Sequence, residues 1–258
     1  MGQFSSVREE SGIGKIVKEF PERRVKNRRR AYYNPETMKN GLLHGMKAFL
    51  FDLDGTLIDS KLDIVNSVNA MLRKTGRTEL PLEMVASYVG HGAPQLMASV
   101  LGPDASESDR EAALQIFLQH YEDHKLDATR LYPGTAEGLH LLQGQPMAVL
   151  TNKPHKISVQ ILEGLGIANH FQAIYGGDSF TTKKPDPAGA LAILRELRAE
   201  PGEAAMVGDS DVDIQTARNA GMVAVGVSYG FGQHNRIANP ADIYVETLEA
   251  LPKLAVRA

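Results

Sequence analysis

Two aspartates, Asp52 and Asp54, stand one residue apart at the end of the apolar run MKAFLF. Because side chains alternate along a strand, a strand that continues to Asp54 places both carboxylates on the same side. Two like charges held this close raise the affinity of the site for a proton or a cation. Asp-Gly after a strand is also a common turn, so a chemical role for the pair depends on what the rest of the chain brings beside it.

Short apolar runs and helical segments alternate over the second half of the chain. The apolar runs cover residues 146–152, 172–178, 204–210, 223–230 and 242–246. Helices are predicted over 155–166, 187–199 and 211–220. Short apolar strands separated by helices are typical of a parallel sheet that is covered on both faces. The predicted fold class is therefore α/β, with a Rossmann-like parallel sheet and helices on both of its faces.

Polar residues follow the apolar runs and share one predicted position, the carboxyl edge of the sheet, where open parallel sheets hold their ligands. They are Asp52, Asp54, Thr151, Asn152, Lys184, Asp209 and Asp213. Several carboxylates in one crevice attract a hard cation such as Mg²⁺, which prefers oxygen ligands. The Lys184 ammonium and the Thr151 hydroxyl are suited to phosphate oxygens. So are the backbone N–H groups of Gly55 and Thr56, which follow the aspartate pair.

The chain contains no cysteine, which excludes thiol catalysis, zinc thiolate sites and disulfides. The predicted set of side chains suits phosphoryl transfer, where catalysis consists of positioning and charge stabilisation. With no thiol present, an aspartate can attack phosphorus and form an aspartyl phosphate. The formal net charge of -3 gives no indication of nucleic-acid binding. No apolar run approaches the ~18 residues that span a bilayer.

Residues 60 to about 130 read as a helical block inserted after the first predicted strand, and no strand pattern interrupts it. Apolar residues recur at helical spacing in this block. In its first helix they are Leu62, Val65, Val68, Met71 and Leu72. The predicted organisation is an α/β core of residues 46–60 and 131–258 with an all-α insertion at 61–130.

Four segments resemble, in order, the four motifs of the haloacid dehalogenase-like phosphatases. They are DLDGTLIDS, LTNKP, KKPDP and VGDSDVD. The segments YPGTAEGLHLL, YGGDSFTTKKPDP, VGVSYGFG and YVGHGAPQLM are similar to the phosphoglycolate phosphatase branch of that superfamily. The resemblance covers about residues 46–250. It implies a haloacid dehalogenase-like core and a mobile helical cap formed by residues 61–130.

The resemblance implies roles for the residues that would carry the chemistry. Asp52 would be the nucleophile and a Mg²⁺ ligand. Asp54 would be the general acid and then the base, and would bind the metal through its backbone carbonyl. Lys184 would neutralise charge on the nucleophile and the phosphate, whereas Lys183 and Asp211 are expected to be surface residues.

Further residues would bind the substrate or support the metal. By resemblance, Thr151 and Asn152 would hold phosphoryl oxygens, although both could equally cap the following helix. Asp209 would bind Mg²⁺, and Asp213 would support the metal site from behind the direct ligands or through water, although it could equally be an N-terminal helix residue with no metal role. His91 lies in a loop flanked by glycines in the predicted cap, where it could face the substrate or solvent.

The function that the resemblance implies is Mg²⁺-dependent hydrolysis of a small phosphorylated metabolite in the cytoplasm, with 2-phosphoglycolate as the favoured substrate. Alternatives within the superfamily are a phosphatase for sugar phosphates, amino-sugar phosphates or pyrophosphate, and a β-phosphoglucomutase-like phosphomutase. An alternative of another class is a non-catalytic module that binds a phosphorylated metabolite. No nucleic-acid partner is predicted.

The first 45 residues differ in charge from the remainder. They carry ten Lys and Arg and five Glu, a net charge of +5, whereas the remaining 18 Lys and Arg and 26 Asp and Glu give -8. We interpret them as a basic, disordered extension. Three origins are open: translation that begins at Met46, a basic tail for anionic partners, or a lipid-anchored segment that contacts membranes, since MGQFSS matches a myristoylation pattern.

Overall fold

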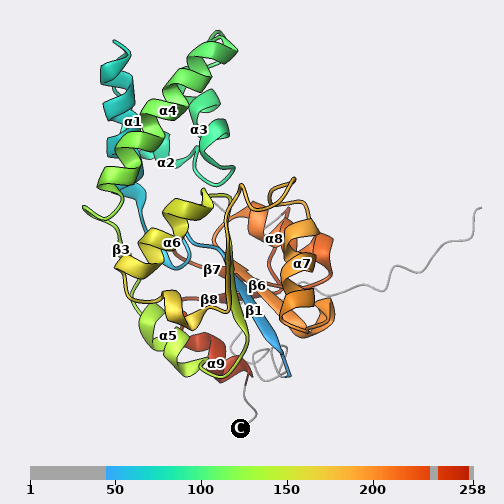
Figure 1. The fold of residues 1–258 in the computed structure, drawn as a ribbon. Helices are drawn as coiled ribbons and strands as arrows, with labels where there is room; N and C mark the ends of the chain where they lie inside the picture. The colour runs from blue at the N-terminus through green and yellow to red at the C-terminus, as the bar shows by residue number, and fades with distance from the viewer. Residues whose placement is uncertain (1–44, 233–237, 256–258) are drawn as a thin grey trace, which may run out of the picture. The chain divides into compact units, whose positions relative to one another are not determined.

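The computed structural model describes residues 45–232 and 238–255, and within these ranges six strands form one sheet (Figure 1). The order across the sheet is β5-β4-β1-β6-β7-β8, and every neighbouring pair is parallel. The strands are β1 (Ala48–Phe51), β4 (Met147–Leu150), β5 (Ala173–Tyr175), β6 (Ala204–Gly208), β7 (Val223–Val227) and β8 (Ile243–Val245). The predicted parallel α/β sheet is confirmed.

Helices cover both faces of this sheet, because alternate side chains of each strand point to opposite sides. Phe49 and Phe51 pack in one hydrophobic cluster, whereas Ala48 and Leu50 pack in another. The first cluster is covered by α5 (Thr135–Leu141), α6 (His155–Gly164) and α9 (Ala250–Ala255). The second is covered by α7 (Ala188–Glu196) and α8 (Asp211–Ala220). Short 3-10 helices, η2 (Ala168–His170) and η3 (Pro201–Glu203), complete the connections.

The chain leaves this α/β layer through a small antiparallel pair, β2 (Ile58–Asp59) with β3 (Arg130–Leu131). The residues between these strands contain only helices as regular structure. The helices are α1 (Lys61–Lys74), α2 (Leu82–Ala86), α3 (Ala93–Leu101) and α4 (Glu107–His124). The helical insertion is thus where the sequence predicts it. The division of the chain into a core and a cap at the predicted boundaries stays a prediction.

Four of the five apolar residues that define the first insertion helix are buried, but Leu62 is 45% exposed. At about 100° per residue, Leu62 lies well off the buried stripe that is centred on Val68 and Met71. Its placement on that stripe was therefore wrong. The β2–β3 pair was not predicted, since two-residue strands carry no period-2 signal. The helices α5 and α9 were not predicted either.

The predictions for the amino-terminal extension fall outside the described residues. Within the described residues, no helix is long and apolar enough to cross a membrane.

Candidate active site at the carboxyl edge of the sheet

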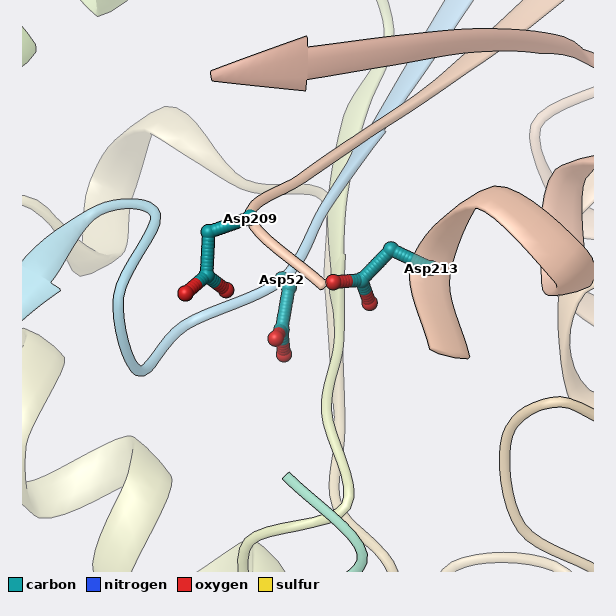
Figure 2. Close-up of side chains that lie close together, drawn as sticks. All are labelled: Asp52, Asp209 and Asp213. Carbon is teal, nitrogen blue, oxygen red and sulfur yellow. The ribbon is translucent and has the colours of Figure 1, made fainter. Parts of the chain in front are cut away.

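Three buried carboxylates converge beyond the carboxyl ends of β1 and β6. Asp52 directly follows β1, Asp209 follows β6, and Asp213 lies in the first turn of α8 (Figure 2). One ligand oxygen from each lies within 4.8 Å of the others. Strands β1 and β6 are neighbours in the sheet, which is why residues more than 150 positions apart in the sequence meet here.

Lys184 supplies the positive charge of this cluster. Its Nζ lies 2.6 Å from Oδ1 of Asp213 and 2.8 Å from Oδ1 of Asp52, and the residue is buried. Burial lowers the pKa of Lys184, but the charges of Asp213 and Asp52 outweigh burial, and the pKa lies above its ordinary value. The ammonium therefore stays charged at neutral pH, as the predicted role requires. Lys183 is exposed, as expected.

One ammonium does not balance three carboxylates. Burial, followed by the charge of Asp213, raises the pKa of Asp52 to about 6. Burial, followed by the charges of Asp213 and Asp52, raises the pKa of Asp209 to about 8. A cation that binds among carboxylates that repel one another in this way stabilises them.

The donor set fits a hard divalent cation. It consists of carboxylate oxygens, the ligand type that such ions prefer. In addition, Oδ1 of Asp52 is buried and accepts no hydrogen bond from any described residue, although the Lys184 ammonium is in ion-pair contact with it. A buried oxygen that accepts no hydrogen bond is costly unless a charged partner satisfies it. A bound cation would be such a partner for Asp52, in addition to Lys184.

Asp209 is held in place from two sides. Its Oδ2 accepts hydrogen bonds from the backbone N–H groups of Phe231 at 2.8 Å and Gly232 at 2.6 Å. On the other side, Thr56 Oγ1 donates to its Oδ1 at 3.5 Å. Gly55, at φ +83°, comes so close that a Cβ would lie 2.2 Å from Oδ2 of Asp209. Gly55 and Thr56 do not line the cavity, and their backbone N–H groups donate to the carbonyls of Ile58 and Leu53, so their contact with substrate stays a prediction.

Asp54 has partners that the sequence did not lead us to expect. Lys153 Nζ lies 2.9 Å from Oδ1 and 3.0 Å from Oδ2 of Asp54, and Ser60 Oγ donates to Oδ1 at 2.5 Å. The same ammonium lies 4.5 Å from the centre of the Tyr121 ring. Lys153 directly follows Thr151 and Asn152 in the LTNKP motif, and this position was the sequence feature that could have indicated that it lies at the site. In the sequence, Tyr121 recurs at helical spacing with Leu114, Phe117 and Leu118, a pattern that indicates only a buried helix face.

Thr151 and Asn152, the pair predicted to bind phosphoryl oxygens, differ in whether their side chains are available to a ligand. Thr151 lines the cavity, and its Oγ1 accepts a hydrogen bond from the N–H of Lys153 at 3.3 Å. The Asn152 amide is fully used, because it donates to the carbonyls of Gly90 and Lys184 and accepts from the Lys184 N–H. The Asn152 side chain thus fixes the Lys184 backbone and the insertion loop, which leaves only its backbone for a phosphoryl group.

His91 is exposed and does not line the cavity, although its neighbours Gly90 and Gly92 do. The predicted substrate contact from this side chain is not supported by its placement. A Cβ at Gly92, whose φ is +88°, would lie 3.0 Å from the Asn152 carbonyl oxygen. Gly92 thus lets the backbone of the loop approach the α/β layer, while the His91 side chain is exposed.

The cavity that contains the aspartates has a polar wall and an apolar wall. The polar wall includes Asp52, Asp54, Thr151, Asn152, Lys153 and Asp209. The opposite wall, from the helical insertion, includes Ile64, Val89, Leu96, Phe117, Leu118 and Tyr121. A reacting group would thus be held by the polar wall while the rest of the ligand meets the insertion.

The match with a known family comes from the same residues. A family model described as haloacid dehalogenase-like hydrolase matches residues 49–227, which include all of the converging aspartates and Lys184. The chain is a haloacid dehalogenase-like hydrolase. The predicted resemblance to that superfamily is confirmed.

Two curated relatives of this haloacid dehalogenase-like hydrolase carry the same name. A phosphoglycolate phosphatase of Chromobacterium violaceum is 38% identical over 215 residues, which cover 81% of this chain and 96% of that protein. A phosphoglycolate phosphatase of Neisseria meningitidis is 40% identical over 202 residues, which cover 75% of this chain and 85% of that protein.

A solved structure supports the same fold. The crystal structure described as a predicted phosphoglycolate phosphatase from Haemophilus somnus has a TM-score of 0.77 and 30% sequence identity. It covers 81% of this hydrolase and 98% of that chain. The similarity therefore extends over almost the whole of the solved chain.

Proposed function

We propose that this haloacid dehalogenase-like hydrolase is a Mg²⁺-dependent phosphatase that converts 2-phosphoglycolate to glycolate and phosphate through an aspartyl phosphate at Asp52. The observation that carries the reaction type is the buried cluster of Asp52, Asp209 and Asp213, in which Asp52 and Asp213 contact the Lys184 ammonium. The choice of substrate rests on the relatives that bear the name phosphoglycolate phosphatase. A cytoplasmic location remains a prediction.

Asp52 and Asp209 would hold Mg²⁺ directly, together with the backbone carbonyl of Asp54. Both oxygens of Asp213 are already engaged, Oδ1 with Lys184 and Oδ2 with the N–H and hydroxyl of Ser210. This favours an indirect, supporting role for Asp213. When bound, the metal supplies positive charge that favours the ionised form of Asp52 and offsets negative charge on the phosphoryl group.

In the first half of the reaction, a carboxylate oxygen of Asp52 attacks phosphorus, and the bond between phosphorus and the substrate oxygen breaks. Asp54 donates a proton to the departing alkoxide. Lys184 offsets the charge of the nucleophile and the phosphoryl oxygens, and the Thr151 hydroxyl donates a hydrogen bond to one of those oxygens. The products at this point are free glycolate and an aspartyl phosphate.

In the second half, Asp54 accepts a proton from water as the water attacks phosphorus. The bond between phosphorus and Asp52 breaks, phosphate leaves and the carboxylate is regenerated. One residue thus acts first as an acid and then as a base. The apolar insertion wall would exclude other water while the first half proceeds.

Phosphate release from the purified full chain tests this proposal. The substrates are 2-phosphoglycolate, a panel of sugar and amino-sugar phosphates, and pyrophosphate, each with Mg²⁺ and with a chelator. We expect Mg²⁺-dependent release from 2-phosphoglycolate, reduced at least ~10³-fold in Asp52→Asn. Preferential release from another ester, also lost in Asp52→Asn, would keep the mechanism and change the substrate. Release that survives in Asp52→Asn would contradict the assigned nucleophile.

A further inference from the structure

Two of the side chains that line the cavity, Lys153 and Tyr121, have no part in the phosphoryl-binding set described above. Among the described residues, Lys153 is the only Lys, Arg or His that lines it. Tyr121 is the only polar side chain that the described helical insertion contributes to it. These two groups lie together, since the Lys153 ammonium is 4.5 Å from the centre of the Tyr121 ring.

Lys153 places a buried positive charge at the cavity wall, beside Asp54 and Tyr121. An ammonium group has three N–H donors. Asp54 offers two acceptor oxygens to it, at 2.9 and 3.0 Å, and the aromatic ring of Tyr121 covers another side. The Lys153 side chain is only 4% exposed, so an anion that reaches it is largely removed from water. In such a place a charge-assisted hydrogen bond is at its strongest.

Tyr121 offers a second donor. Its hydroxyl is buried and has no hydrogen-bond partner among the described residues, and the residue as a whole is 2% exposed. Buried tyrosine hydroxyls ordinarily have a partner, because an unpaired buried donor is costly. An acceptor that arrives in the cavity would remove that cost.

We propose that Lys153 and Tyr121 form the subsite that recognises the carboxylate of the substrate, beside Asp54, where the polar wall of the cavity meets the helical insertion. A carboxylate accepts from both an ammonium and a hydroxyl, and each of its oxygens has free lone pairs. This inference deepens the proposed function and rests on it: the substrate class is a phosphate monoester whose alcohol portion carries a carboxylate close to the ester oxygen.

The remainder of the insertion wall supports this choice of substrate class. Its other described side chains are aliphatic or aromatic, such as Ile64, Leu96 and Phe117. The several hydroxyls of a sugar phosphate would lose water against this wall without gaining partners, which costs free energy for each unpaired group. One carboxylate beside a short methylene has no such excess of polar groups.

Binding of two non-hydrolysable phosphonates measures the subsite without relying on turnover. The first, 3-phosphonopropionate, has a carboxylate in the position of that of 2-phosphoglycolate. The second, propylphosphonate, has a methyl group there. Calorimetric affinities for both are measured on the full chain with Mg²⁺ present, and their ratio is the carboxylate preference. Any effect of a variant on the phosphoryl group affects both compounds and cancels in the ratio.

We expect the wild type to prefer the carboxylated compound by about 30-fold or more, the size of one charge-assisted hydrogen bond. Lys153→Met removes the charge but keeps most of the stem, and should remove most of the preference, leaving at most the part that the Tyr121 hydroxyl supplies. Lys153→Arg should retain part of it, and Tyr121→Phe should reduce it by about 3- to 10-fold. The matched control is Lys47→Met, which removes an exposed lysine paired with Glu203 away from the cavity and should leave the ratio unchanged.

Two results would overturn the inference: no preference in the wild type, or an unchanged preference in both Lys153→Met and Tyr121→Phe. Tyr121→Phe keeps the test decisive if Lys153→Met does not fold, because it removes a single oxygen. Failure of the proposed function would appear in the phosphate-release assay instead. The wild type would then show the carboxylate preference but release no phosphate from 2-phosphoglycolate.

Discussion

The ammonium nitrogen of Lys184 lies 2.8 Å from Oδ1 of Asp52, so the residue proposed as nucleophile is in contact with a buried positive charge. The same nitrogen lies 2.6 Å from Asp213. Lys184 therefore has two functions, which are to orient the nucleophile and to hold two buried carboxylates together. Its backbone is fixed independently, because the Asn152 amide bonds both its N–H and its carbonyl oxygen.

Lys184→Met should destabilise the metal-free protein, since it leaves two buried carboxylates without their cation. Removing one partner of a buried ion pair costs about 3–5 kcal/mol. Urea denaturation in the presence of chelator measures this loss. Lys183→Met is the matched control, because that lysine is exposed, and it should change the free energy of unfolding by less than ~0.5 kcal/mol. Equal effects of the two substitutions would contradict the role of Lys184.

The stability of the metal-free protein should fall as the pH rises from about 5 to about 8. The pKa of Asp209 is raised to about 8 and that of Asp52 to about 6, from ordinary values of 3.8. In this window the folded chain binds more protons than the unfolded chain, so raising the pH favours unfolding. Melting temperatures in chelator at several pH values test the prediction. A melting temperature that rises steadily over this interval would contradict it.

Saturating Mg²⁺ should therefore raise the melting temperature more at about pH 8 than at about pH 5, because the cation replaces protons that the free site holds at low pH. Asp209→Asn should remove most of this difference. It should also make the chelated protein more stable at about pH 8 than the wild type, since it removes like-charge repulsion. An Mg²⁺ effect of the same size at both pH values in the wild type would argue against a metal site at these carboxylates.

Gly55→Ala should weaken Mg²⁺ binding as well as stability. The new Cβ would lie 2.2 Å from Oδ2 of Asp209, and the residue has φ +83°. Gly76→Ala separates the two causes, because Gly76 also has a positive φ, +70°, but nothing lies within 4 Å of its added Cβ. We expect Gly76→Ala to cost about 1 kcal/mol through backbone strain alone with unchanged Mg²⁺ affinity by calorimetry. Gly55→Ala should cost more and lower the affinity. The same Mg²⁺ affinity in both variants would show that the contact with Asp209 is unimportant.

Asp63 should fix the two chain segments that enter and leave the helical insertion. It is buried in α1 and accepts hydrogen bonds from the N–H groups of Ala128 and Thr129 and from the Thr129 hydroxyl. Asp63→Ala leaves buried donors unpaired, which should cost about 2–4 kcal/mol in urea denaturation. Asp59→Ala, which removes a more exposed pair with Arg130, should cost less than ~1 kcal/mol. Similar losses in both variants would refute this view of Asp63.

The sheet and the convergence of Asp52, Asp209, Asp213 and Lys184 could be predicted from the sequence. Apolar runs separated by helices specify a parallel sheet, and polar residues after such runs must meet at one edge. The rule places Asp52 and Asp209 at the same edge of the sheet, and the pairing of β1 with β6 in the structure brings them close together.

The contact of Lys153 with Asp54 and Tyr121 could not be predicted in the same way. Helical periodicity places Tyr121 on the buried stripe of α4, but it does not say which part of the α/β layer that stripe meets. The positions of the Thr56 and His91 side chains could not be predicted for a similar reason. Both lie in loops next to the site, and only the three-dimensional path of the loop decides whether a side chain points into the cavity, as that of Thr151 does, or away from it.

The most direct test of the central claim is to trap the phosphorylated residue. Enzyme in excess is mixed with 2-phosphoglycolate and Mg²⁺, quenched within one turnover and reduced with borohydride, which converts an aspartyl phosphate to homoserine. Peptide mass spectrometry then locates the homoserine. The account predicts homoserine at position 52, and none in Asp52→Asn or in chelator. Phosphate release with no homoserine at position 52, or homoserine at another aspartate, would contradict it.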